Sequence, residues 1–130
     1  MSVLVGYIPT AEGRAALTAA VTEARLRATS LIVLNASSGD SLVDPRHATT
    51  EAIAEIDQEL AAAGVPHTVE HLNGRDPVDE IVRRAGQDDV DLVVIGLRRR
   101  SPVGKLLMGS AAQRILLEVG CPVLAVKGAG

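Results

Sequence analysis

The chain has 130 residues, the length of one domain and too short for two hydrophobic cores of ordinary size. Hydrophobic types make up 47% of it and charged types 22%, so it can bury a core and is not typical of a disordered protein. Its only aromatic residue is Tyr7, which argues against binding single-stranded nucleic acid by stacking bases on aromatic side chains. Sixteen acidic residues against 13 lysines and arginines give a net charge of −3, which also disfavours nucleic acid as a partner.

The cysteine count and the N-terminus narrow the class of protein further. Cys121 is the only cysteine, so an internal disulfide and a multi-cysteine zinc site are excluded. The first ten residues lack the basic and apolar regions of a signal peptide, and no apolar run approaches the roughly 20 residues of a membrane span. We therefore expect a cytosolic protein without membrane contact, folded as a single domain over residues 1–130.

Short apolar runs alternate with helical patterns along the chain. In order, the sequence predicts a strand at Val3–Tyr7, a helix at Glu12–Ala28, a strand at Leu31–Leu34, a helix at Pro45–Ala63, a strand at His67–Leu72, a helix from Pro77 capped by Asp76, a strand at Leu92–Ile95, a helix at Ser110–Val119 and a strand at Val123–Val126. Four of the strands are continuously apolar, as in parallel sheets covered on both faces. The segment at 67–72 alternates polar and apolar residues and predicts an edge strand. This order predicts an α/β fold, a five-stranded parallel doubly wound sheet with helices on both faces.

The segment Ile95–Ser110 carries the clearest functional signal. A strand ends at Gly96, a loop follows, and Gly109-Ser110 opens the last helix, so the backbone N–H groups of Gly109, Ser110 and Ala111 are predicted to point toward an anion. Four basic residues and no acidic one lie in this segment: Arg98, Arg99, Arg100 and Lys105. A solvated basic loop with an ordinary serine cap is the alternative interpretation. Neither a P-loop nor a G-x-G-x-x-G motif is present.

The order of the elements, the strand end Val94–Gly96, the spacing from there to Gly109-Ser110, and the ending Cys121–Lys127 occur together in this chain. In these features the whole chain resembles the universal stress protein family. Nucleotide-binding members show Gly, two residues, Gly, nine residues, and then Gly-Ser or Gly-Thr. Three of these four positions match here, and Arg99 stands at the second glycine.

The resemblance implies a Rossmann-like fold of the adenine nucleotide alpha hydrolase type, with strand order 3-2-1-4-5. It also implies a site for ATP or AMP, with or without Mg²⁺, at the carboxyl ends of the first and fourth strands, which are the topological switch point. The implied nucleotide-binding positions are Gly6, Tyr7, Ile8, Ala36, Ile95, Gly96, Arg99, Gly109, Ser110 and Ala111. Such members usually carry Asp where this chain has Ile8, which accepts no hydrogen bond. A guanidinium at Arg99, in contrast, offers charged hydrogen bonds to a phosphate.

Two other functions stay open at the level of sequence. The replacements at Ile8 and Arg99 favour a nucleotide-free interaction protein that acts through dimerisation and a partner in the stress response. His67 and His71 share one face of the predicted edge strand and, with Cys121, are the only basis for a metal- or thiol-dependent enzyme. Solvent-facing imidazoles and a cysteine that fills a small core position are the simpler interpretation. No nucleophile–base pair is recognisable, so slow ATP hydrolysis is the most activity we expect.

The sequence of the last predicted strand indicates a second binding partner, which is another copy of the chain. The resemblance implies a homodimer paired through Val123, Leu124, Ala125 and Val126. This strand is apolar throughout and lies at the edge of the predicted sheet, where its unpaired backbone groups favour association.

Overall fold

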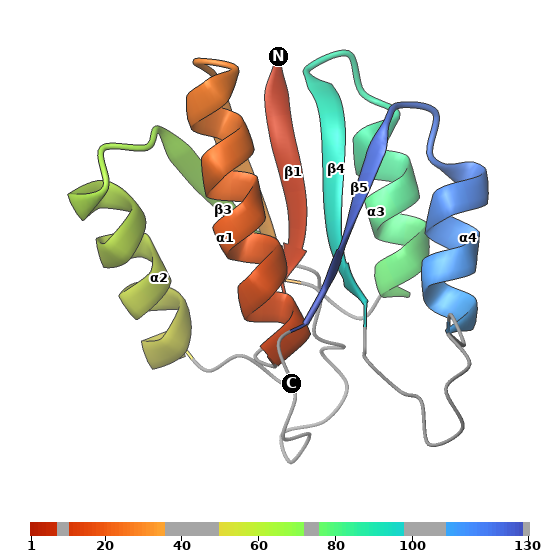
Figure 1. The fold of residues 1–130 in the computed structure, drawn as a ribbon, viewed down its shortest axis with the longest axis horizontal. Coiled ribbons are helices and arrows are strands. Elements are labelled where there is room, and N and C mark those ends of the chain that lie inside the picture. Colours follow the sequence, from red (N-terminus) through yellow and green to blue (C-terminus); the bar gives the residue numbers. More distant parts are fainter. Residues whose placement is uncertain (8–10, 36–49, 72–75, 98–108, 129–130) are drawn as a thin grey trace.

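The computed structural model describes residues 1–7, 11–35, 50–71, 76–97 and 109–128. Five parallel strands form one sheet in the order β3-β2-β1-β4-β5, and four helices connect them (Figure 1). The strands are β1 (Ser2–Tyr7), β2 (Ser30–Asn35), β3 (His67–His71), β4 (Val90–Leu97) and β5 (Val123–Lys127); the helices are α1 (Ala11–Leu26), α2 (Thr50–Ala62), α3 (Pro77–Ala85) and α4 (Ser110–Glu118). The predicted fold and strand order are confirmed.

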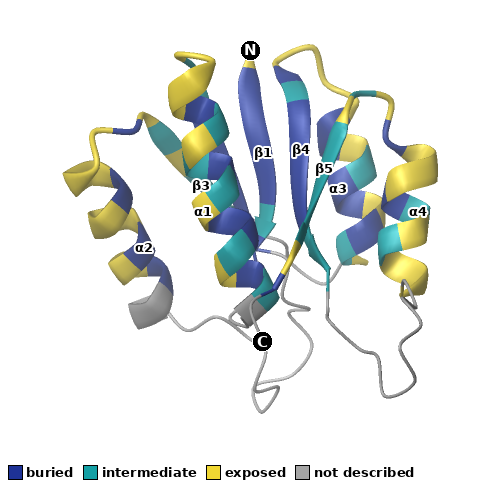
Figure 2. Cartoon of the chain, in the orientation of Figure 1, coloured by how far each residue is buried: buried dark blue, intermediate teal, exposed yellow. Residues whose placement is uncertain are grey.

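Two aliphatic cores lie on opposite faces of the sheet, which explains the continuously apolar strands. One core packs under α1 and α2, and the other packs under α3 and α4. Alternation along β1 sends Val3, Val5 and Tyr7 to the first core and Leu4 to the second. The central strands are accordingly buried from end to end apart from a few positions (Figure 2). No helix among the described residues is long and apolar enough to cross a membrane.

Strand β3 lies at the sheet edge, as its alternating sequence predicts. Val69 packs against the core under α1 and α2, whereas Thr68 on the other face is exposed. Among the described residues it pairs with β2 alone, where Leu31 pairs with His67 and Asn35 with His71. A strand half covered by one helix needs apolar residues on one face only, and this explains why it differs from the other four.

The first two helices end in the same backbone motif. After α2, the Gly64 N–H bonds to the carbonyl of Ala61 at 3.1 Å and the next N–H bonds back to Leu60, with Gly64 at φ 72°. After α1, Ala28 takes the equivalent left-handed position at φ 53°. Helix α1 therefore ends at Leu26, two residues before the predicted boundary, because Ala28 already belongs to the turn.

Candidate functional site

A pocket of about 400 Å³ opens at the carboxyl ends of β1 and β4, the two strands from which successive connections run in opposite directions. This is where ligands bind in open α/β sheets, and the volume falls within the range of small-molecule sites. The described residues that line it are Gly6, Glu12, Gly13, Asp76, Pro77, Val78, Ile81, Ile95, Gly96, Ala111, Ala112 and Ile115. They come from the two strands and from the N-terminal parts of α1, α3 and α4.

The floor of the pocket is apolar. Ile81, Ile95 and Ile115 are each buried in the core under α3 and α4. A β-carbon placed on Gly6 would lie 3.0 Å from Cδ1 of Ile81, so glycine at this position lets α3 approach the end of β1 closely. The floor can therefore accept a flat apolar group and offers it aliphatic contacts.

One wall of the pocket is the N-terminus of α4, where no side chain of the described residues caps the backbone N–H groups. Gly109 is the N-cap residue and supplies no side-chain hydrogen bond. The first intrahelical bond of the helix runs from the N–H of Gln113 to the carbonyl of Gly109 at 3.1 Å. The N–H groups of Ser110, Ala111 and Ala112 precede it and have no partner within the helix. Together with the helix dipole, these donors favour a bound anion.

The neighbouring wall is the N-terminus of α3, whose first N–H groups are capped by Asp76 and whose Asp79 accepts a hydrogen bond from Arg114 of α4 at 2.5 Å. Asp76 is the N-cap residue, and its Oδ1 accepts hydrogen bonds from the N–H of Val78 at 2.8 Å and of Asp79 at 3.4 Å. Pro77 has no N–H to offer. The carboxylate brings negative charge to this wall, so the wall favours an anionic ligand group less than the N-terminus of α4 does.

The third wall is the first turn of α1, which lies directly against β4. A β-carbon on Gly96 would overlap the carbonyl oxygen of Glu12 and fall 2.6 Å from its carbonyl carbon. Gly128 makes a similar approach, with a β-carbon position 3.1 Å from Cα of Glu12. Glycine at 96 is thus required by helix–strand packing, whether or not a ligand is bound. This packing brings Glu12 and Gly13 into the pocket wall.

The structure brings together part of the predicted site. Gly6, Ile95, Gly96 and Ala111 line the pocket, and Gly109 and Ser110 lie exposed where α4 begins. The implied positions Ile8, Ala36 and Arg99 lie outside the described residues, as do Arg98, Arg100 and Lys105.

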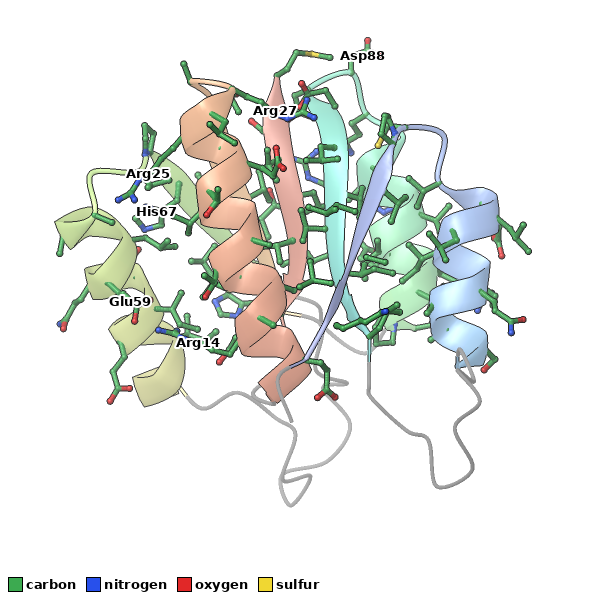
Figure 3. The ribbon with its side chains drawn as sticks, viewed as in Figure 1. Arg14, Arg25, Arg27, Glu59, His67 and Asp88 are labelled. Carbon is green, nitrogen blue, oxygen red and sulfur yellow. The ribbon has the colours of Figure 1, made fainter. Side chains whose placement is uncertain are left out.

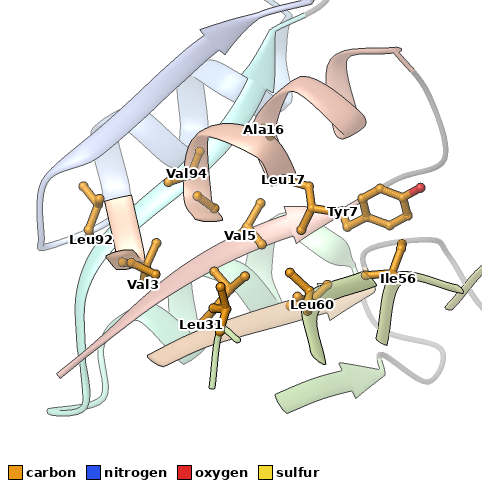
Figure 4. Packing of buried hydrophobic residues seen from close by; sticks show 14 of the residues in the cluster. Val3, Val5, Tyr7, Ala16, Leu17, Leu31, Ile56, Leu60, Leu92 and Val94 are labelled. Atoms are coloured by element: carbon orange, nitrogen blue, oxygen red, sulfur yellow. The ribbon is translucent and has the colours of Figure 1, made fainter. Parts of the chain in front are cut away.

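Tyr7 lies apart from the pocket although it follows Gly6. Its ring packs beside Leu17 and Ile56 in the core under α1 and α2 (Figure 4). Burial there raises the pKa of the Tyr7 hydroxyl. Consecutive residues of a strand face opposite sides of the sheet. Because Gly6 faces the pocket, the side chain of Tyr7 faces the other side.

Sequence reasoning missed Glu12, Asp76, Ile81 and Ile115 as site residues. The sequence already identifies Asp76 as a helix cap. Because every helix of a parallel sheet begins at the carboxyl ends of the strands, the same signal could have placed Asp76 at the pocket.

The imidazole of His67 is committed to contacts within the chain. Its Nε2 lies 2.5 Å from Oδ1 of Asp57 on α2, and its Nδ1 lies 2.8 Å from the carbonyl oxygen of Val65. Burial lowers the pKa of His67, but the hydrogen bonds to Val65 and Asp57 outweigh it, and the pKa is raised above its ordinary value. Both partners accept hydrogen bonds, so these contacts favour the doubly protonated imidazolium, and both ring nitrogens are engaged within the chain. Among the described residues no group of three or more His, Cys, Asp and Glu is placed to hold a metal.

Cys121 is half-buried against the core under α3 and α4. Burial raises the pKa of its thiol, which disfavours the reactive thiolate. This position fits a small core residue better than a nucleophile.

A second hollow, of about 390 Å³, lies at the other end of the sheet, between the end of α1 and the start of β3. Its charged residue is Arg25, whose guanidinium donates to the carbonyl oxygen of Ala63 at 2.9 Å (Figure 3). The hollow faces no helix N-terminus, and it lies at the amino ends of the strands. The pocket at the carboxyl ends is therefore the better candidate site.

The fold described above is also found in known proteins that are similar to this chain. Residues 1–127 match the model of the universal stress protein family. The chain is 44% identical over 128 residues to a universal stress protein of Mycolicibacterium smegmatis, with 98% of each chain covered. It is similar to a solved universal stress protein of Archaeoglobus fulgidus, with a TM-score of 0.68, 31% identity and 97% of each chain covered. It is also similar to an Archaeoglobus fulgidus universal stress protein in complex with dAMP, with a TM-score of 0.60, 26% identity, and 97% of this chain and 96% of that chain covered. The chain belongs to the universal stress protein family.

Proposed function

We propose that this universal stress protein is a regulatory module that binds an adenine nucleotide, ATP or AMP, in the pocket at the carboxyl ends of β1 and β4. The observation that carries the proposal is the open N-terminus of α4 beside an apolar floor. A nucleotide needs this pair of surfaces, because its phosphate is an anion and its base is flat and largely apolar.

The phosphate is assigned to α4 and the base to the floor. The N–H groups of Ser110, Ala111 and Ala112 would donate to phosphate oxygens, and such charged hydrogen bonds contribute about 1.5–3 kcal/mol each. Ile81 and Ile95 would contact the base. In the sequence, Ile8, Ala36 and Arg99 complete the proposed set, and the basic residues after β4 supply positive charge for the phosphates.

The relative from Archaeoglobus fulgidus supports the choice of ligand. That protein was solved in complex with dAMP, and it is similar to this chain over almost the full length of both. An adenine monophosphate therefore suits the fold. The preference between ATP and AMP depends on how many phosphates the N-terminus of α4 and the basic residues engage.

Isothermal titration calorimetry with ATP and magnesium, AMP, and adenosine tests the proposal. We expect micromolar binding of ATP or AMP, about −8 kcal/mol, and at least about a hundredfold weaker binding of adenosine because it lacks the phosphate. Equal affinity for adenosine would refute the placement of the phosphate. No heat with any of the three up to millimolar concentration would refute nucleotide binding altogether, and the dimeric interaction protein would then be the better function.

We also propose that two copies of the chain pair through β5. This strand lies at the sheet edge, and its residues from Val123 to Val126 are half-buried. The Pro122 carbonyl accepts from the N–H of Val93, and the Gly128 N–H donates to the carbonyl of Leu97. In a parallel ladder this pattern directs the backbone groups of residues 122, 124, 126 and 128 to β4, and those of residues 123, 125 and 127 outward. The outward groups are the ones a second copy would pair with.

The substitution Ala125→Pro tests the pairing without breaking the ladder to β4. Proline removes one outward N–H and fits an edge position whose N–H faces solvent. We expect sedimentation velocity at micromolar concentration to show a dimer for the wild type, a monomer for Ala125→Pro, and a dimer for the control Ala125→Ser, which keeps the N–H. A monomeric wild type, or a Pro variant that stays dimeric, would contradict the proposal.

A further inference from the structure

One carboxylate oxygen of Asp76, at the rim of the pocket, is not used by the cap of α3. Its Oδ1 accepts both capping hydrogen bonds of α3, from Val78 and Asp79. Its Oδ2 accepts no hydrogen bond from the residues that the structure describes, and the side chain belongs to an exposed residue that lines the pocket. Because a carboxylate accepts through both of its oxygens, half of the acceptor capacity of Asp76 remains for a ligand.

Two walls of the pocket consequently carry opposite electrostatic character. Its α4 wall offers N–H donors and the positive end of a helix dipole, and its α3 wall offers a carboxylate. A phosphate is attracted to the first wall and repelled by the second. A ligand that carries its anion at α4 therefore presents its uncharged part to Asp76, which fixes the direction in which it lies.

The uncharged part must bring a hydrogen-bond donor. In a nucleotide the donors beyond the phosphate are the hydroxyls of the sugar and the amino group of the base. The base fits the apolar floor of Ile81, Ile95 and Ile115, whereas sugar hydroxyls suit the rim because they can stay partly hydrated there. Asp76 is exposed at the rim, so its position matches that of the sugar hydroxyls.

We propose that Asp76 selects the sugar of the bound nucleotide, because its Oδ2 accepts hydrogen bonds from the ribose hydroxyls. This inference rests on the proposed nucleotide function and adds a residue that reads the ligand at the end opposite its phosphate. A charged hydrogen bond of this kind corresponds to a difference of about tenfold or more in affinity.

Titration calorimetry with AMP, 2′-deoxy-AMP, 3′-deoxy-AMP and 2′,3′-dideoxy-AMP tests the inference on three proteins: wild type, Asp76→Ser and Asp79→Ser. Serine at 76 keeps the helix cap, since Ser and Asp cap about equally well, but it lacks the second oxygen. Asp79→Ser is the control for charge, because it removes the same charge in the first turn of α3 at a residue outside the pocket lining. Asp79 also accepts a hydrogen bond from Arg114 of α4, so the stability measurement on this variant includes the loss of that ion pair. Thermal denaturation of each variant measures whether the cap is intact.

We expect the wild type to bind dideoxy-AMP about tenfold or more weakly than AMP, and the two monodeoxy ligands to show which hydroxyl is used. Asp76→Ser should bind AMP as weakly as the wild type binds dideoxy-AMP, and should no longer distinguish the two ligands. Asp79→Ser should keep the full preference for AMP.

The outcomes separate this inference from the proposed function. A wild type that binds none of the four ligands, and no ATP, refutes the nucleotide function and the inference with it. A wild type that binds AMP and dideoxy-AMP equally keeps the function and overturns the role of the sugar hydroxyls. A preference for AMP that survives in Asp76→Ser overturns the assignment to Asp76. Inosine monophosphate, which lacks the amino group of the base, is the last ligand to compare. If the wild type prefers AMP over inosine monophosphate but not over dideoxy-AMP, and Asp76→Ser loses that preference, Asp76 contacts the amino group of the base. That result would overturn the sugar contact.

Discussion

The substitution Gly109→Asp tests the phosphate placement with opposite effects on stability and on binding. Gly109 has φ −66° and ψ 157°, an extended conformation open to any residue, and a β-carbon there meets no atom of the described residues within 4 Å. An aspartate therefore fits without strain. Its carboxylate would accept from the N–H groups of Ala111 and Ala112, the same positions that Asp76 caps at the start of α3.

The two magnitudes follow from this geometry. A cap at a former glycine stabilises a helix by a few tenths of a kcal/mol, and a charge at the helix N-terminus adds about 0.3–1 kcal/mol, so the free energy of unfolding should rise by about 0.5–1 kcal/mol. A bound phosphate would lose two N–H donors, a loss of about 3–6 kcal/mol, and would meet a negative charge as well. We therefore expect a more stable protein whose affinity for AMP falls at least about a hundredfold.

Titration calorimetry with AMP and urea unfolding, carried out on the same preparations, measure both effects. Gly109→Ala is the matched control: it fills the same open space, adds no acceptor and no charge, and should bind AMP like the wild type. A decrease in binding together with a decrease in stability would mean local unfolding and would not support the placement. If Gly109→Asp binds AMP as tightly as the wild type, the phosphate does not lie on α4 and the reasoning is wrong.

Three further predictions concern stability and are measured by urea unfolding. Gly96→Ala should destabilise the protein by about 1–3 kcal/mol, because the new methyl group overlaps the backbone of Glu12; an unchanged midpoint would show that α1 does not lie this close. Ala28→Gly should stabilise it by about 0.5–1 kcal/mol, because φ 53° is strained for alanine; a loss of stability would contradict this. The pKa of His67 is raised in the folded state, so its stabilisation is fully present below the ordinary value of 6.5 and is lost as the pH rises through the higher folded value. Asp57→Asn should flatten this decline above pH 6.5, and identical slopes for variant and wild type would exclude the contact as its source.

The sequence predicts the fold well because each strand meets one kind of environment. The four continuously apolar runs are strands of a sheet that has a core on each face, and the alternating run is the half-covered edge strand. The boundaries were less accurate where backbone geometry decides them. Ala28 has a good helical propensity, and only its left-handed conformation in the turn after α1 excludes it from the helix.

The site was harder to predict because it is assembled from the starts of three helices that are far apart in the sequence. The residues of one motif, Ile95 to Ala111, indicated an anion site at α4 and identified that wall of the pocket. Asp76 and Glu12 reach the same pocket from other segments, and no local pattern assigns them to a ligand. Their contribution follows only once the strand order brings the carboxyl ends of β1 and β4 together.

Gly96 shows that a glycine in a ligand-binding motif can be required by the packing of its neighbours. It matches the first glycine of the pattern found in nucleotide-binding members of the family, and it lies in the pocket wall. Yet the atoms that exclude a side chain at this position are the backbone carbonyl of Glu12 on α1, not a ligand. Gly109 is the reverse case, because none of the residues that the structure describes lies close enough to require glycine there. A glycine without a described packing contact, at a helix start that no described side chain caps, leaves room for a bound anion, and this contrast supports the proposed placement of the phosphate at α4.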